Sequence, residues 1–223
     1  MDIRNLPSKC PCGKDFDTTH AMNCTTGGFI HGRHNKIRDM ECKLLQVVCK
    51  DVQSEPPLQV LTNTQKNTYP KTARVGDDAR PDIRARGFWR QGQNAFFDVR
   101  VTNINCESQK NTKISSILLE HEQVKKRHYN RRIMEVEQGS FTPLVFTTAG
   151  VMGYECTKYH KSLAEKLSEK QGEKYEIVMR YLRVKLSFLA LKSTLVCLRG
   201  SRSTCKDIEM GEDFAYTLNE LGL

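Results

Sequence analysis

The stretch RPDIRARGFWRQGQNAFFDVRV, from Arg80 to Val101, reads as two β-strands joined by a turn. Gly92 lies in the polar segment RQGQ between the two arms, where glycine supplies the backbone freedom that a hairpin turn needs. A turn centred near Arg90 places Asp82 on the first arm opposite Asp98 on the second. The hairpin is therefore expected to carry one carboxylate on each strand.

Alternation of side chains along the second arm places Phe97, Val99 and Val101 on one face and Asp98 and Arg100 on the other. Carboxylates on directly opposed positions have β-carbons roughly 5 Å apart and repel each other. A divalent cation is a natural counter-charge, and oxygen ligands suit Mg²⁺ or Mn²⁺, which bind phosphate oxygens and activate water. On spacing alone an alternative stays open, in which Asp82 caps a strand and Asp98 pairs with Arg84 or Arg100.

The segments around the hairpin predict an α/β chain with a small mixed sheet. The expected order is a helix, three strands, a helix and a strand, followed by two further helices and a polar tail. The predicted elements are a helix at 33–50, a strand at 55–64, the two hairpin arms, a helix at 112–139 closed by Gly139, a strand at 142–150, and helices at 158–170 and 173–198. We expect three regions, at 1–32, 33–150 and 151–223.

The apolar stripe of the first predicted helix is not wholly apolar. Glu41 lies on it, and Arg33 and His34 lie near its start. An inward carboxylate near an acidic pair could bind a metal or orient water, whereas the alternative is a flank residue that turns to solvent. Glu55 is a rival acidic candidate.

Four potential metal ligands lie within fifteen residues near the start of the chain. Cys10, Cys12, His20 and Cys24 follow the spacing C-x-C-x₇-H-x₃-C, and the last gap places His20 and Cys24 one helical turn apart. Four such ligands can close a tetrahedral zinc site, which would be structural because no position remains for a reacting water. The alternative is a set of unrelated thiols.

Charge and hydropathy favour a soluble intracellular protein with an anionic partner. The chain carries a formal net charge of +9, and nucleic acid is the commonest partner of such a chain. The start has no apolar signal segment, and the most apolar stretch, 186–198, is too short for a bilayer and contains Lys192. The run VKKRHYNRR, 124–132, has five basic residues in nine and predicts either a phosphate track or a solvated helix face.

Together these residues resemble the restriction-endonuclease-like nucleases with a PD…(D/E)xK signature, and more closely the endonuclease region of site-specific non-LTR retrotransposon polyproteins. The resemblance rests on the cysteine–histidine cluster, RHN at 33–35, RPD at 80–82, Asp98, KKRHY at 125–129 and TPLVFTTAG at 142–150. It covers roughly residues 10 to 150. It implies an αβββαβ core with a zinc knuckle in front of it and a helical extension behind it.

The resemblance implies a DNA endonuclease that leaves a 3′-hydroxyl for reverse transcription. Asp82 and Asp98 would hold Mg²⁺, while Arg33, Arg80, Arg127, Tyr129, Arg131 and Arg132 would contact DNA. Arg100 stands where the wider superfamily has lysine, so Lys125 or Lys126 on the following helix would supply the catalytic cation together with Arg100, with Glu41 and His34 shaping the site. The cysteine spacing is also shorter than the family's.

The implied partners are DNA, element RNA and a reverse transcriptase domain, in the nucleus or in the cytoplasm before import, with no membrane. Two other functions stay open. One is a zinc-knuckle module of a decayed element that binds nucleic acid without cleavage. The other is a domain whose last two helices dock another chain.

Overall fold

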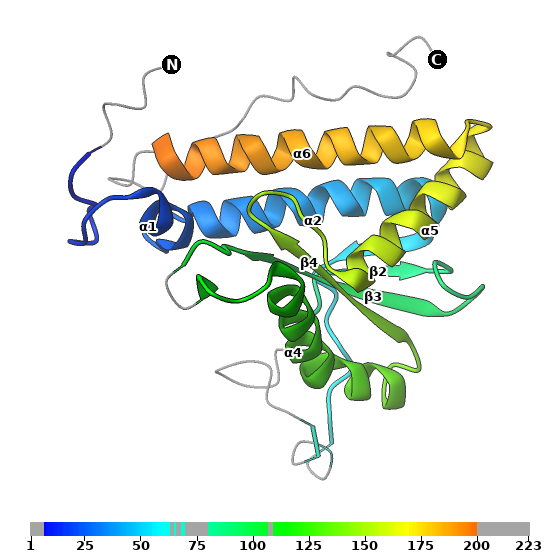
Figure 1. Cartoon of the computed structure of the whole chain (residues 1–223). Coiled ribbons are helices and arrows are strands. Elements are labelled where there is room, and N and C mark those ends of the chain that lie inside the picture. Colours follow the sequence, from blue (N-terminus) through cyan, green and yellow to red (C-terminus); the bar gives the residue numbers. More distant parts are fainter. Residues whose placement is uncertain (1–6, 63–64, 66–67, 70–79, 107–108, 200–223) are drawn as a thin grey trace.

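The computed structural model describes residues 7–62, 65, 68–69, 80–106 and 109–199, and it forms a mixed α/β fold with a four-stranded sheet and five helices (Figure 1). The elements are α1 (Thr18–Asn23), α2 (Phe29–Val48), β1 (Lys50–Ser54), β2 (Ile83–Arg86), β3 (Asn94–Thr102), α4 (Ile114–Glu135), β4 (Ser140–Thr147), α5 (Tyr154–Gln171) and α6 (Tyr175–Arg199).

The strands lie in the order β1-β2-β3-β4. The first three are antiparallel, and β4 runs parallel to β3 after the α4 crossover. In the hairpin Ile83 pairs with Phe97 and Ala85 with Ala95, which is the register predicted from the sequence. Strand β2 begins at Ile83, so Asp82 stands one residue before the first pair.

The predicted strand at 55–64 is wrong. Strand β1 ends at Ser54, which pairs with Ile83, and the described residues from Glu55 to Thr62 contain no strand, while 63–64 lie outside the described residues. Glu55 takes a positive φ of 49° and two prolines follow it. Proline has no N–H to donate to a strand ladder, so pairing ends where β1 stops.

Apolar clusters lie on both faces of the sheet. On one face Phe97, Val99 and Leu144 pack against α2, α5 and α6, and on the other Phe96 and Phe141 pack against α4. Figure 1 shows α6 lying over α2, with α4 on the opposite side of the sheet. The larger cluster combines residues of 33–150 with residues of α5 and α6, which therefore belong to the same core. Within the described ranges no helix is both long and apolar enough to span a membrane.

Candidate functional site

Asp82 is held at the start of β2 by groups from two other elements. Its Oδ2 accepts a hydrogen bond from the backbone N–H of Val99 on β3 at 2.6 Å. Its Oδ1 lies 2.9 Å from Nε2 of His34 on α2, which is within ion-pair distance when the imidazole is protonated. The carboxylate is thus positioned by the hairpin and by α2 together.

Asp98 lies on β3 next to this group, on the face that α4 covers. It is only 3% exposed, and Lys125 Nζ of α4 lies 2.5 Å from its Oδ2. Burial raises the pKa of Asp98 to about 6 against the opposing effect of the Lys125 ammonium, and the charge of Asp82 adds to the rise. The two aspartates therefore influence each other electrostatically, with one lysine as the direct counter-charge.

The two candidate lysines of α4 contact different acidic residues. Lys125 contacts Asp98, whereas Lys126 pairs with Glu155 at the start of α5 and joins two helices. Lys126 thus links α4 to α5, and its role as a site cation stays a prediction. Arg100 is half-buried on β3, and burial lowers its pKa while Asp98 acts to raise it. In the described part of the chain no ion pair or hydrogen bond to its guanidinium is found.

Glu41 belongs to the core rather than to the acidic pair, which corrects its predicted role. Its oxygens accept hydrogen bonds from Tyr159 Oη and His160 Nε2 of α5, both at 3.0 Å. It lies seven residues after His34, roughly 10 Å along the helix axis, and its side chain is fully buried. His160 Nδ1 also donates to the Cys156 carbonyl at 2.9 Å, so both ring nitrogens act as donors. Glu41 and Cys156 hold the pKa of this imidazole well above its usual value despite burial.

Three of the predicted DNA contacts are also corrected, because their side chains are buried inside the fold. Arg33 is 4% exposed and donates to the Met22 carbonyl, which ties α2 to α1. Arg132 is 2% exposed and donates to the Gln59 carbonyl. Tyr129 packs on Phe141, and burial together with the charges of the two aspartates raises its pKa. Tyr129 therefore lies close enough to the two aspartates for their charges to act on its hydroxyl group.

The remaining predicted DNA contacts lie on the surface. Arg80 and Arg127 are exposed. Arg131 is exposed as well, but it pairs with Glu135 and lies over the ring of Tyr69. Arg80 is thus an exposed cation two residues before Asp82, and Arg127 and Arg131 are exposed cations of α4.

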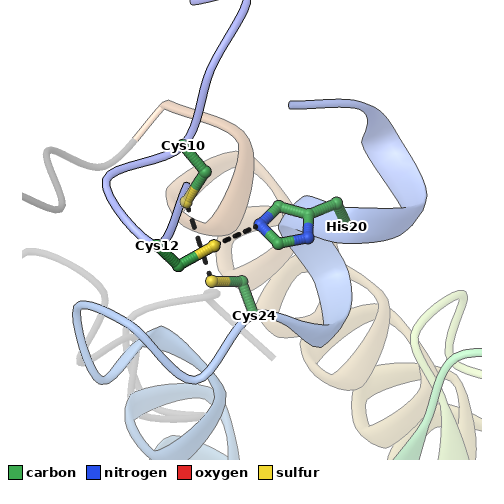
Figure 2. Close-up of side chains that lie close together, drawn as sticks. All are labelled: Cys10, Cys12, His20 and Cys24. Carbon is green, nitrogen blue, oxygen red and sulfur yellow. Dashed lines mark hydrogen bonds between the residues drawn. The ribbon is translucent and has the colours of Figure 1, made fainter. Parts of the chain in front are cut away.

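The second site is the cysteine–histidine cluster, where the four predicted ligands converge (Figure 2). Cys10 and Cys12 come from a tight turn in which Gly13 has a φ of 88°, and His20 and Cys24 come from α1 and its C-cap. Asp17 begins α1 by accepting a hydrogen bond from the His20 N–H at 2.6 Å. The turn and the short helix thus aim four side chains at one point.

The ligand atoms of this cluster all lie within 4.8 Å of one another, so they could hold a metal ion such as zinc. Cys10 and Cys24 Sγ are 3.7 Å apart, and Cys12 Sγ is 3.3 Å from His20 Nε2. Burial raises the pKa of Cys10. It acts in the same direction on Cys24, but hydrogen bonds with Thr26 bring the pKa of that thiol below its usual value. Among the described residues this is the one grouping of three or more such ligands that meets that distance.

Sequence reasoning missed Arg38 and the partners of Glu41. Arg38 lies one turn after His34, pairs with Glu55 and Asp39, and feels the charge of Asp82. The i,i+4 spacing of His34 and Arg38 is a signal that could have found it. Tyr159 and His160 gave no such signal, because only the packing of α5 on α2 brings them to Glu41.

A scan against protein-family models finds no match for this chain, and a search of curated proteins finds no relative. The two sites therefore carry the functional argument by themselves.

Proposed function

We propose that the chain is a metal-dependent DNA endonuclease that hydrolyses a phosphodiester and leaves a 3′-hydroxyl. The observation that carries the proposal is the placement of Asp82, Asp98 and Lys125 at one point, where two strands and the crossover helix meet. The element order from α2 to β4 supports the restriction-endonuclease-like class suggested by the PD…D signature. Two acids and a cation are the set of residues that the resemblance implies for this chemistry.

The acidic pair suits a Mg²⁺ or Mn²⁺ ion, which Asp82 and Asp98 would hold. Asp98 Oδ2 is buried, and its direct counter-charge is the Lys125 ammonium at 2.5 Å. A buried carboxylate whose pKa is raised beside a second carboxylate gains from a cation. Such an ion supplies Lewis-acid stabilisation of negative charge on the phosphate oxygens.

The remaining roles fall to this chain's own side chains. Lys125 and Arg100 would stabilise the negative charge that develops on the phosphate, since both are cations on the Asp98 side of the sheet. His34 Nε2 would hold a proton next to Asp82 Oδ1. Exposed Arg80 and Arg127 would contact the DNA backbone. A zinc ion in the cysteine–histidine cluster would have a structural role and stabilise the fold around its four ligands.

As part of this proposal, the nick would prime reverse transcription in the nucleus, with element RNA and a reverse transcriptase domain as partners. Nicking of supercoiled plasmid in Mg²⁺ or Mn²⁺ tests the catalytic core of the idea. Asp82→Asn and Asp98→Asn should each abolish nicking, and chelation of the metal should do the same. Asp51→Asn is the matched control, because Asp51 is an exposed aspartate on β1 whose φ of 49° asparagine tolerates. Equal nicking by all three variants would end the proposal.

A second candidate is a zinc-organised module that binds nucleic acid without cleaving it. It is favoured by the difference between the two sites: four ligand atoms converge in the cysteine–histidine cluster, whereas Asp98 is already paired with Lys125. This candidate predicts salt-sensitive DNA binding that survives Asp98→Asn, with no nicking by the unchanged protein under any metal. The same plasmid and binding assays therefore separate the two functions.

A further inference from the structure

Helix α6 has two apolar faces, and only one of them is buried. Val178, Leu182, Leu186 and Cys197 are buried against the rest of the fold. On the opposite face Val184 is 48% exposed, Phe188 61%, Leu191 56% and Leu195 41%. A helix that is apolar on both sides is typical of one packed between two partners. Figure 1 shows α6 as the outer helix, with α2 between it and the sheet.

The exposed apolar residues follow the spacing of a coiled-coil seam. Val184, Phe188, Leu191 and Leu195 are separated by four, three and four residues, the a/d pattern of a heptad repeat. The same pattern continues to both ends of the helix through half-exposed side chains. We call the whole set the outer seam: Ile177, Tyr181, Val184, Phe188, Leu191, Leu195 and Leu198.

A cavity of about 390 Å³ adjoins the carboxyl end of the outer seam. It is lined by Leu191 and Leu198 of the seam, by Met22 of α1 and by residues after β3 and β4, including Asn105 and Ala149. An apolar side chain from a docked helix would fill such a hollow, in the manner of an interface anchor. The cavity thus lies beside the outer seam and shares Leu191 and Leu198 with it.

The charges beside the outer seam decide which occupant fits. Arg180 lies on one flank, and Lys185 and Lys192 lie on the other, while Glu176 is the only acidic residue in α6. Lys185 Nζ donates to Tyr181 Oη at 2.8 Å, so this cation is held against the seam. A second copy would bring cations against cations in a parallel or an antiparallel pair. A helix with acidic flanks would bring opposite charges together.

We propose that the outer seam binds an amphipathic helix of another protein, with apolar residues at its a and d positions and acidic residues beside them. This surface is separate from the proposed endonuclease site, and its occupant need not take part in cleavage. The apolar seam supplies the buried area, and the cationic flanks select the partner by charge and speed its association.

A synthetic helix of about three heptads is a direct probe. One peptide carries isoleucine at a, leucine at d and glutamate at e and g, and the matched control peptide carries lysine at e and g. Fluorescence anisotropy with the full chain should show binding of the acidic peptide, weakened by salt, and at least about tenfold weaker binding of the lysine peptide. The double variant Phe188→Ser, Leu191→Ser should lose about tenfold or more in affinity. Val60→Ser, at another exposed apolar position, should not change it.

Three outcomes would overturn the proposal. The first is equal binding of both peptides, or of neither. The second is a dimer of the unchanged protein by light scattering that the double variant converts to monomer, since a second copy would then occupy the seam. The third is binding of the acidic peptide only after residues 200–223 are removed, since the chain would then supply the occupant itself. Circular dichroism on the double variant checks that its loss of affinity is not a loss of fold.

Discussion

Replacing Asp98 by asparagine is expected to stabilise the metal-free protein at neutral pH while it removes nicking. The carboxyl group is buried, and its pKa rises from an ordinary 3.8 to about 6. A folded-state pKa above the unfolded value means that the native protein keeps a proton that the unfolded chain has already lost. The stability that this proton confers is present below about pH 4 and is lost as the pH rises through about 6.

The size of the effect follows from the same two pKa values. One pH unit of pKa difference corresponds to about 1.4 kcal/mol, so ionisation of Asp98 lowers the free energy of unfolding by about 3 kcal/mol above pH 6. Asparagine resembles the protonated acid in shape and carries no charge. Asp98→Asn should therefore recover most of that free energy at about pH 7.5 and almost none at about pH 4.

Urea unfolding of both proteins across this pH range, in buffer without added Mg²⁺ or Mn²⁺, measures the difference directly. Asp51→Asn serves as the control, because Asp51 is exposed and its replacement should leave the pH dependence unchanged. Added Mg²⁺ should stabilise the unchanged protein and not Asp98→Asn. The reasoning fails if Asp98→Asn is less stable than the unchanged protein at neutral pH, or if the difference between them does not depend on pH.

Three further predictions concern the other groups. Lys125→Gln should lower the nicking rate by about a hundredfold or more, since it removes the cation beside Asp98. Lys126→Gln, whose lysine pairs with Glu155, should keep most of the rate. Comparable losses in both variants, measured on folded protein, would refute the choice of Lys125 as the catalytic cation. Elemental analysis should find one zinc per chain. His20→Ala should lose this zinc, whereas His31→Ala, at an exposed histidine of α2, should retain it. Retention of zinc by both variants would exclude the cysteine–histidine cluster as the zinc site. Glu41→Gln should destabilise the fold by about 3 kcal/mol, because it leaves the buried His160 without its carboxylate. The folded fraction of this variant should still nick plasmid, and Glu165→Gln, at an exposed glutamate, is the control. Unchanged stability of Glu41→Gln would contradict the buried Glu41–His160 pair.

Local pattern was enough to predict the hairpin register and the element order. Alternation along β3 places Asp98 and Arg100 together, and the position of the turn fixes which residues pair. The cysteine–histidine cluster was equally accessible, since its ligands lie close together in sequence. In each of these features the interacting residues are near neighbours, so spacing carries the information.

The rest depends on contacts between distant segments. Nothing in the run VKKRHYNRR distinguishes Lys125 from Lys126, because the docking of α4 against both β3 and α5 decides which lysine meets which acid. Arg33 and Arg132 look like surface cations in the sequence and are buried against backbone carbonyls of other segments. Glu41 meets its partners only through a contact that spans 118 residues of sequence.

The parallel pairing of β3 with β4 also bears on how the protein avoids aggregation. Until α4 has crossed over and β4 has docked, one edge of β3 is a nine-residue strand with Phe96, Phe97 and Val99 in sequence. An unpaired apolar edge of this length is a template for pairing with another chain. A charge within such a strand is one of the devices that discourage such pairing, and Asp98 stands in the middle of it. The carboxylate proposed to serve the reaction would thus also protect the chain during folding, before any site exists.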